Sequence, residues 1–546
     1  MKKVIIGWLA LGASLLASAQ TPVAPPARPK LVVGIVVDQM RWDYLHRFGE
    51  RYGEGGFKRL LREGFSCDAT YINYVPTVTA IGHASIYSGT VPAIHGMAGN
   101  DFIIQSTGKT AYCVGDDTVE AVGAPRLGGR SPRNLLTSTI TDELKLATHF
   151  RSKVIGVALK DRGAILPAGH AADGAYWFDD ATGTWGTSTY YMKTLPGWVD
   201  DFNAKGPAAS YAAATWNPLY PLETYVQSVP DANPYERELV KGTANRFPLE
   251  ISKMGKDRHT GVRLSYFGDK LTLEFAKAAI DGERMGRGTV TDFLAVSLSS
   301  PDAAGHVFGT NSPRMEDLYL RLDGELDAFF KWLDERYGRD GYLVFLTADH
   351  GAAHTASFLT DNRIPGGAWP AKQHIAALNE LLRANHGEAG LVVDINNYRV
   401  CLNNPLIAEK KLDEGKIREE CVRYFQKAEG VAFAVDVDRV SQAAIAAPLR
   451  EQIINGYHAA RSGVVQIVLE PGWYAGSALG TTHGTWNPYD AHIPLVWMGW
   501  GITAGRSSRT VHITDIAPTL AALLSIQVPN GCIGEAIPEV LAHRAK

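Results

Sequence analysis

The chain has no excess of basic residues. Its 546 residues include 54 lysines and arginines against 57 aspartates and glutamates, so that the formal net charge is −3. Nucleic-acid binding needs clustered positive charge, and the sequence gives this function no electrostatic support. Internal repeats and low-complexity tracts are also absent. With 45% hydrophobic and 20% charged residues, the composition is that of an ordinary soluble globular protein.

Cysteine is scarce, and its spacing excludes the commonest metal and redox motifs. None of the five cysteines forms a C-x-x-C pair, and their odd number allows at most two intramolecular disulfides. Proximity in sequence makes Cys67–Cys113 and Cys401–Cys421 plausible pairs, but it does not establish connectivity. We interpret the cysteines as structural.

Long apolar runs are missing except at the N-terminus. Lys2 and Lys3 precede an apolar run from residue 4 to residue 16, and a small-residue cleavage site follows at residues 17–19. This pattern predicts a signal peptide over residues 1–19, and its apolar run is too short to span a membrane comfortably. We expect a secreted or periplasmic protein with no membrane span in its mature form. A short proline-rich linker follows at residues 20–30.

Short apolar runs alternate with helical patterns and predict the fold class. Runs rich in β-branched residues are typical of buried strands in a parallel sheet, and helical stretches follow them. One predicted helix, at residues 269–281, has Asp269 as a possible cap. The alternation predicts an α/β fold with a mostly parallel central sheet and helices on both faces. The predicted strands are 31–37, 153–159, 293–298, 342–347 and 493–498.

Two stretches break this alternation. Residues 164–265 are rich in aromatics and turn residues without a sustained period, and residues 370–480 carry their own short strand and helix patterns. Both are too long to be structureless loops in a compact domain. We therefore expect an aromatic-rich inserted subdomain and an α+β inserted subdomain. The core would consist of residues 31–163, 266–369 and 481–546.

Six acidic and imidazole side chains follow predicted strands or lie in a glycine-containing loop. Ligands of open α/β sheets gather at the carboxyl ends of the strands, so these residues predict a two-metal hydrolytic centre. Mixed imidazole and carboxylate ligands favour zinc. Taken singly, such an aspartate is most often a cap or turn residue and such a histidine is structural, so the joint occurrence carries the prediction. The six are Asp38, Asp302, His306, Asp349, His350 and His483.

Four further residues are candidates for binding and reacting with a substrate. Thr79 begins a predicted helix, where a metal and the helix N-terminus could activate its hydroxyl, although one threonine there could simply be the N-cap. Lys160 and Arg162 follow the strand at 153–159 and would project on one side in extended geometry, which suits a phosphoryl dianion. Asn100 could donate to a phosphoryl oxygen. The alternatives are a solvated turn for the charged pair and an ordinary turn residue for Asn100.

These residues, taken in order, resemble the alkaline phosphatase superfamily. The resemblance rests on the run Pro76-Thr77-Val78-Thr79-Ala80-Ile81-Gly82-His83, then His95-Gly96 and Asn100, and on the later pairs Asp302/His306 and Asp349/His350 with His483. Within the superfamily, the chain is most similar to secreted, phosphate-irrepressible alkaline phosphatases with a threonine nucleophile. The C/S-x-P-x-R run of sulfatases is absent. The resemblance covers a little over half of the chain and excludes both insertions.

The resemblance implies a zinc-dependent phosphomonoesterase with two Zn²⁺ ions. One ion would be held by Asp302, His306 and His483, and the other by Asp38, Asp349 and His350. Thr79 would also contact the metals and form a phosphothreonine intermediate, while Asn100, Lys160 and Arg162 would bind the phosphoryl oxygens. The expected partners are small-molecule phosphate monoesters, and the expected state is a monomer. The alternatives are a phosphodiesterase or nucleotide pyrophosphatase of the same superfamily, and a non-catalytic exported zinc- or carbohydrate-binding protein.

Overall fold

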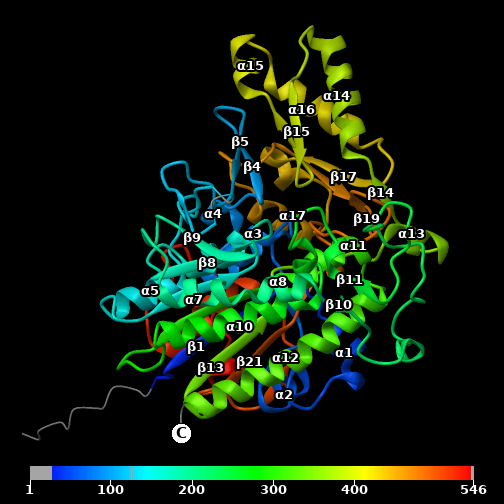
Figure 1. Ribbon diagram of the computed structural model, residues 1–546. Helices are drawn as coiled ribbons and strands as arrows, with labels where there is room; N and C mark the ends of the chain where they lie inside the picture. Colours follow the sequence, from blue (N-terminus) through cyan, green and yellow to red (C-terminus); the bar gives the residue numbers. More distant parts are fainter. Residues whose placement is uncertain (1–27, 125, 127, 543–546) are drawn as a thin grey trace, which may run out of the picture.

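A large mixed sheet forms the centre of the protein. The computed structural model describes residues 28–124, 126 and 128–542, so the predicted signal peptide and most of the linker lie outside the described residues. The main sheet has the order β22-β2-β21-β13-β1-β12-β7-β8-β9-β6, and its outermost strands are β22 (Gly505–Ser507) and β6 (Ala121–Val122). Its middle strands are parallel and match the predicted runs, which confirms the α/β fold class (Figure 1). These strands are β13 (Tyr342–Thr347), β1 (Leu31–Val37), β12 (Asp292–Leu298) and β7 (Val154–Ala158).

Antiparallel strands extend the sheet on one side of this parallel centre. β21 (Leu495–Gly499) runs antiparallel to β13, and β2 (Phe65–Cys67) runs antiparallel to β21. Every residue of β1, β12, β13 and β7 is buried. Strands covered on both faces need apolar residues at successive positions, which is why they appear in the sequence as continuous runs rather than as alternating patterns.

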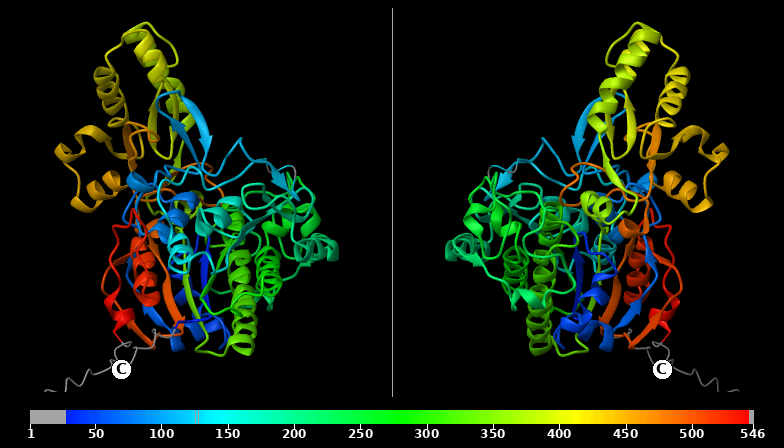
Figure 2. Two further views of the ribbon diagram at one scale, coloured as in Figure 1. Left: turned by 90° about the vertical axis from the view of Figure 1, so that its left-hand side faces the viewer. Right: turned by 90° about the vertical axis from the view of Figure 1, so that its right-hand side faces the viewer.

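Helices cover both faces of the sheet (Figure 2). On one face, α6 (Asp161–Ala168) packs against the strands, α3 (Thr79–Ser88) packs against α6, and α19 (Ile516–Leu524) packs against α3. On the other face, α10 (Tyr266–Gly282) packs against the strands and α12 (Pro313–Tyr337) packs against α10. Within the described residues, every helix is too short or too polar to span a bilayer.

Helix α3 packs unusually close to the end of β13. Gly82 makes this possible, because a Cβ at that position would lie 2.3 Å from the backbone oxygen of Asp349. The sequence therefore brings the start of α3 next to the loop that carries Asp349 and His350.

The aromatic-rich stretch differs from its sequence-based description. Its first part contains two strands of the main sheet, β8 (Gly174–Asp179), parallel to β7, and β9 (Thr184–Ser188), antiparallel to β8. Trp177 and Trp185 are buried in the main core. The sequence did not indicate β8 as a strand because it has no run of β-branched residues, and large aromatics occupy its buried central positions. The rest of the stretch also packs on the main core, through Trp216 among others.

The second stretch contains a four-stranded sheet with its own apolar core. Leu378, Ile417 and Phe425 are among the residues of that core. We call residues 370–480 the α+β module, which lies above the main sheet in Figure 1. The division of the chain into core and inserted domains stays a prediction. The principal elements of the module are α14 (Ala371–His386), β15 (Val392–Asn396), β16 (Arg399–Leu402), α16 (Glu414–Phe425), β17 (Val431–Asp436), α17 (Ala447–Asn455) and β18 (Val465–Leu469).

Two local predictions were wrong. All five cysteines are free thiols, so neither Cys67–Cys113 nor Cys401–Cys421 forms a disulfide. Helix α10 begins at Tyr266 after Ser265, and Asp269 lies inside the helix rather than at its cap. The Asp269 carboxyl is buried and accepts a hydrogen bond from the backbone N–H of Ser300, so packing against the start of the next helix decided its position.

Candidate active site

The site lies at the carboxyl ends of four neighbouring strands. Asp38 directly follows β1, Asp349 and His350 follow β13, and Lys160 follows β7. Asp302 lies in α11 (Ser300–Phe308), the helix after β12. Because β13, β1, β12 and β7 are adjacent and parallel, their ends converge, although the residues are hundreds of positions apart in the sequence.

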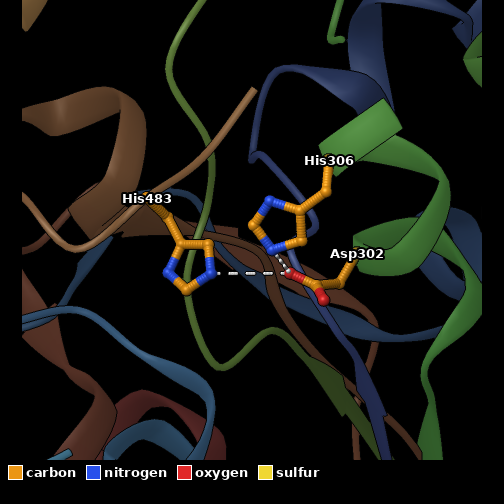
Figure 3. Close-up of side chains that lie close together, drawn as sticks. All are labelled: Asp302, His306 and His483. Carbon is orange, nitrogen blue, oxygen red and sulfur yellow. Dashed lines mark ion pairs between the residues drawn. The ribbon is translucent and has the colours of Figure 1, made fainter. Parts of the chain in front are cut away.

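The first group of ligand-type side chains is Asp302, His306 and His483. His306 Nε2 lies 3.2 Å from Asp302 Oδ1, and His483 Nε2 lies 3.5 Å from the same oxygen. Figure 3 shows both rings directed at this carboxylate. Asp302 and His306 share one face because α11 is helical, as the i, i+4 spacing predicted. The geometry suits a metal ion, and it is the set that the resemblance implied.

The second group surrounds His350. Its Nε2 lies 3.6 Å from Asp38 Oδ1 and 3.5 Å from Asp349 Oδ2. A second possible metal-binding cluster consists of Asp38, Asp302 and His350, whereas the resemblance implied Asp349 in place of Asp302. The rings of His350 and His483 stack with centroids 3.5 Å apart, so the two groups adjoin each other.

All three histidines present the same ring nitrogen to the site. Nδ1 of His306, His350 and His483 lies 2.9, 2.9 and 2.8 Å from the backbone oxygens of Thr481, Gly351 and Thr77, respectively. A carbonyl oxygen only accepts, so each Nδ1 carries a proton and Nε2 is the nitrogen that faces the carboxylates; in the neutral ring this Nε2 has the lone pair that a metal needs. This arrangement is typical of histidines that ligate metals.

The electrostatics of the carboxylates also suit a bound cation. Burial and the neighbouring Asp349 raise the pKa of Asp38 well above its usual value. Burial opposes ionisation of Asp302 too, but His306 and Lys160 outweigh it and hold that pKa well below its usual range. Among the described residues, Asp38 Oδ1 and Asp349 Oδ2 are buried without a hydrogen-bond partner. Buried carboxylate oxygens of this kind need a cation or a donor, so the residues present fit a metal.

Thr79 is the first residue of α3, and the N-cap is Val78. The interpretation of a threonine as the cap is therefore wrong at both positions, since Thr77 donates its hydroxyl to the backbone oxygen of Thr485. Thr79 Oγ1 is buried and lies 3.4 Å from His350 Nε2. The hydroxyl thus stands beside the second ligand group at a helix N-terminus, where negative charge is stabilised.

Lys160 and Arg162 do not project from an extended segment, as the sequence had suggested. Helix α6 begins at Asp161 directly after Lys160, and the helical turn separates the two side chains. Lys160 Nζ lies 2.6 Å from Asp38 Oδ2 and 2.5 Å from Asp302 Oδ2, which links the two ligand groups. Arg162 Nη1 instead donates to the hydroxyl of Tyr112 over 3.2 Å.

Arg162 and Asn100 are each held by a contact outside the ligand groups. Burial lowers the pKa of Arg162, but Tyr112, Cys113 and Asp161 outweigh it, so that the guanidinium stays charged. Tyr112 in turn donates to Asp161 Oδ1 over 2.5 Å. Asn100 Oδ1 accepts a 3.0 Å hydrogen bond from the backbone N–H of Ala80, which connects Asn100 to the first turn of α3.

Two residues of the site were not predicted. Gln39 donates to Asp302 Oδ1 from its side chain and to Asp349 Oδ1 from its backbone. His83 is fully buried, with Nδ1 3.3 Å from Asp349 Oδ2 and Nε2 2.8 Å from Ser297 Oγ. His83 is four residues after Thr79 in a predicted helix, and that spacing was the only signal that could have identified it.

Comparison with known proteins agrees with this geometry. A family model described as type I phosphodiesterase / nucleotide pyrophosphatase matches residues 32–492. A relative from Myroides odoratus named calcium-transporting ATPase is 51% identical, over 94% of this chain and 95% of its own. Alkaline phosphatase PhoV of Synechococcus elongatus is 49% identical over 96% of each chain. The crystal structure of alkaline phosphatase PafA superposes with a TM-score of 0.92 at 47% identity, covering 94% of this chain and 99% of that one.

The chain therefore belongs to the type I phosphodiesterase / nucleotide pyrophosphatase family, within the alkaline phosphatase superfamily. Its similarity to PhoV and PafA extends over nearly its whole length, and it is a hydrolase of the alkaline phosphatase type. Enzymes of this type use a metal cofactor, and the ligand groups described above fit one.

Proposed function

We propose that the protein is an exported phosphomonoesterase that uses two zinc ions and Thr79 as its nucleophile. The observation that carries this proposal is the shared orientation of His306, His350 and His483, whose Nε2 atoms all face two adjoining groups of carboxylates. Zinc is the metal that mixed imidazole and carboxylate ligands favour. The proposed ligands are Asp302, His306 and His483 for one ion, and Asp38, Asp349 and His350 for the other.

Bound zinc would supply positive charge that lowers the pKa of a hydroxyl and stabilises a leaving oxygen. In the proposed reaction, Thr79 Oγ1 loses its proton to solvent and forms a bond to phosphorus, while the bond between phosphorus and the alcohol oxygen breaks and that oxygen takes up a proton from solvent. Water then attacks the phosphothreonine, the bond from Oγ1 to phosphorus breaks, and orthophosphate leaves. The position of Thr79 at the N-terminus of α3 supports its role, because the helix favours the anionic oxygen.

Asn100, Lys160 and Arg162 are proposed to bind the phosphoryl oxygens. Asn100 uses its Oδ1 to accept from Ala80, and its Nδ2 group can donate to the substrate. Lys160 also balances the charge of Asp38 and Asp302. Two cations at one phosphoryl group favour a dianionic monoester over a monoanionic diester.

The substrate class and the metal are tested on one preparation. The rates of hydrolysis of an aryl phosphate and of its methyl diester are compared, with chelator and after zinc is added back. We expect the monoester to react faster, the chelator to abolish both activities, and zinc to restore them. Faster cleavage of the diester would favour the phosphodiesterase alternative that the family description includes. Activity that survives complete metal removal would contradict the proposed centre.

A further inference from the structure

The α+β module contacts two short segments of the core that carry candidate catalytic residues. We call residues 72–79 the nucleophile segment, because it ends at Thr79, and residues 96–101 the Asn100 turn. Figure 2 shows the module packed against one end of the core, where the blue part of the chain that contains these segments lies. Eight hydrogen bonds between the module and these segments or the neighbouring residue Gln105 are described below, and none of them is needed to close the module's own sheet.

Arg399 of β16 anchors the nucleophile segment. Its guanidinium is fully buried and donates to the backbone oxygen of Val75 over 2.9 Å. Its other partners are all neutral, namely Gln466 Oε1, Ser462 Oγ and the backbone oxygens of Gly456 and Ile453. Burial without a carboxylate lowers the pKa of Arg399 to about 10. A buried cation without a counter-ion costs stability, so hydrophobic packing alone gives no reason for an arginine here.

Helix α17 of the module holds the same segment from a second side. Gln452 donates from Nε2 to the backbone oxygen of Ile72 and accepts from the backbone N–H of Val75, and Asn455 donates to the backbone oxygen of Asn73. Beyond these bonds, the backbone oxygen of Thr77 accepts from His483 Nδ1. The nucleophile segment therefore connects the module to both Thr79 and a proposed metal ligand.

The Asn100 turn is held by the loop between β15 and β16. Asn397 Nδ2 donates to the backbone oxygen of Ala98 over 3.2 Å, and Asn396 Nδ2 donates to that of Asp101 over 3.1 Å. The approach is close, because a Cβ on Gly99 would lie 2.1 Å from Asn397 Nδ2. Asn397 has a φ of 51°, a left-handed conformation that asparagine tolerates better than most residues.

Arg461 and Asn404 extend this attachment to the start of the turn and to the residues that follow it. Arg461 donates to the backbone oxygen of Gly96 over 2.7 Å, and its guanidinium lies 4.9 Å from the ring centroid of Phe102. Asn404 donates to Gln105 Oε1 over 3.1 Å. The residues on both sides of Asn100 are thus fixed by the module, whereas Asn100 itself bonds to Ala80 in α3.

We propose that the α+β module is a positioning element of the active site and that Asn397 is a positioning residue that acts through Asn100. This inference rests on the proposed function, in which Asn100 binds a phosphoryl oxygen. Loss of the bond from Asn397 to Ala98 removes one of the contacts that hold the Asn100 turn, so that the turn shifts and the amide of Asn100 is displaced from the phosphoryl group. Misplacement of a binding group by about 1 Å can lower a rate by on the order of a hundredfold.

The test is a double-mutant cycle on full-length, zinc-loaded enzyme. Asn397→Gly removes the side chain without strain at a positive φ. The value of kcat/KM for an aryl phosphate and the inhibition constant of orthophosphate are measured for wild type, Asn397→Gly, Asn100→Ala and the double variant. We expect Asn397→Gly to lower kcat/KM by about tenfold and to weaken orthophosphate binding, and to have no further effect when Asn100 is already alanine.

Asn379→Ala is the matched control. Asn379 donates to the backbone oxygen of Val392 and accepts from its N–H, both at 2.9 Å, inside the module. This variant loses two hydrogen bonds of the same type, so it should lower the melting temperature while kcat/KM stays at the wild-type value.

Three results would overturn the inference: equal losses from Asn397→Gly in both backgrounds, no loss at all, or a loss in Asn379→Ala as large as that in Asn397→Gly. If Asn397→Gly does not fold, Asn397→Asp replaces it, because aspartate tolerates the same backbone conformation but cannot donate to Ala98. Failure of the proposed function is distinguishable, since it would appear as an Asn100→Ala variant with wild-type kcat/KM.

Discussion

Gln39 donates a hydrogen bond from its side-chain Nε2 to Asp302 Oδ1 over 2.8 Å. Its backbone N–H donates to Asp349 Oδ1 over 3.1 Å, so one residue connects carboxylates of both proposed metal sites. Gln39 is buried, with a φ of 67°, which is a left-handed conformation that costs energy for a residue with a side chain. The geometry of the two carboxylates therefore depends on a residue that itself ligates nothing.

Replacement of Gln39 by alanine should weaken metal binding. Loss of such a supporting partner typically lowers metal affinity by about 10- to 100-fold. The measurement is competition for zinc with a chromophoric chelator, which does not depend on activity. Gln373→Ala, at an exposed position of α14, is the matched control. Equal zinc affinity in the two variants would contradict the supporting role of Gln39.

Substitutions of Thr79 and Thr77 should show which of the two threonines is the nucleophile. Thr79→Ser keeps a hydroxyl and should retain measurable activity, whereas Thr79→Ala should lose most of it, by on the order of a thousandfold or more. Acid-quenched enzyme should carry a phosphoryl group on residue 79, detected by mass spectrometry. Thr77→Ala should keep this label. A labelled Thr79→Ala variant would assign the nucleophile to another residue.

Removal of Lys160 and Arg162 should affect monoesters more than diesters. Both cations are proposed to bind the phosphoryl group, whose charge is larger in a monoester. The Lys160→Ala/Arg162→Ala double variant should lower kcat/KM for an aryl phosphate at least tenfold more than for its methyl diester. Lys193→Ala, at an exposed lysine, is the control. An equal loss on both substrates would show that the pair does not discriminate between them.

Asp269 should make the folded state less stable at alkaline pH. Burial raises the pKa of its carboxyl to about 7, against about 3.9 in an unfolded chain. The folded state therefore binds the proton more tightly than the unfolded chain does. The resulting contribution to the free energy of unfolding is fully present below pH 4 and is lost as the pH rises through 7. Asp269→Asn removes the titration. Its free energy of unfolding should exceed that of wild type by a few kcal/mol at pH 9 and by little at pH 4.

Chemical denaturation at the two pH values measures this difference. Asp340→Asn, at an exposed position, should show no such dependence on pH. A variant that is equally stabilised or equally destabilised at pH 4 and pH 9 would show that Asp269 does not titrate between them.

Much of the site could be predicted because its candidate ligands occur at recognisable positions in the sequence, namely at the ends of predicted strands or at helical spacing. Each of Asp38, Asp302 and Asp349 comes at or shortly after the end of an apolar run, and parallel strands bring such ends together. The i, i+4 spacing of Asp302 and His306 needed only a helical turn, which α11 provides. These relationships are local or follow from one rule of sheet geometry.

Other features depended on which atoms meet in space. Sequence patterns did not reveal that Lys160 would bridge Asp38 and Asp302, because that depends on where α6 begins. They also missed β8 and β9, because neither strand contains a run of β-branched residues and both lie among glycines and turn residues. The free cysteines show the same limit, because proximity in sequence does not determine the distance between two side chains.

The sequence by itself determined the α/β class, the parallel strands, the candidate ligands and the threonine at the start of α3. Only the tertiary structure decided the orientation of the histidine rings, the positions of Gln39 and His83 beside the ligand groups, and the contact of the α+β module with the Asn100 turn. The physical reason is that strand and helix patterns come from burial periodicity within short windows, whereas hydrogen bonds between distant segments depend on distances that no local period encodes.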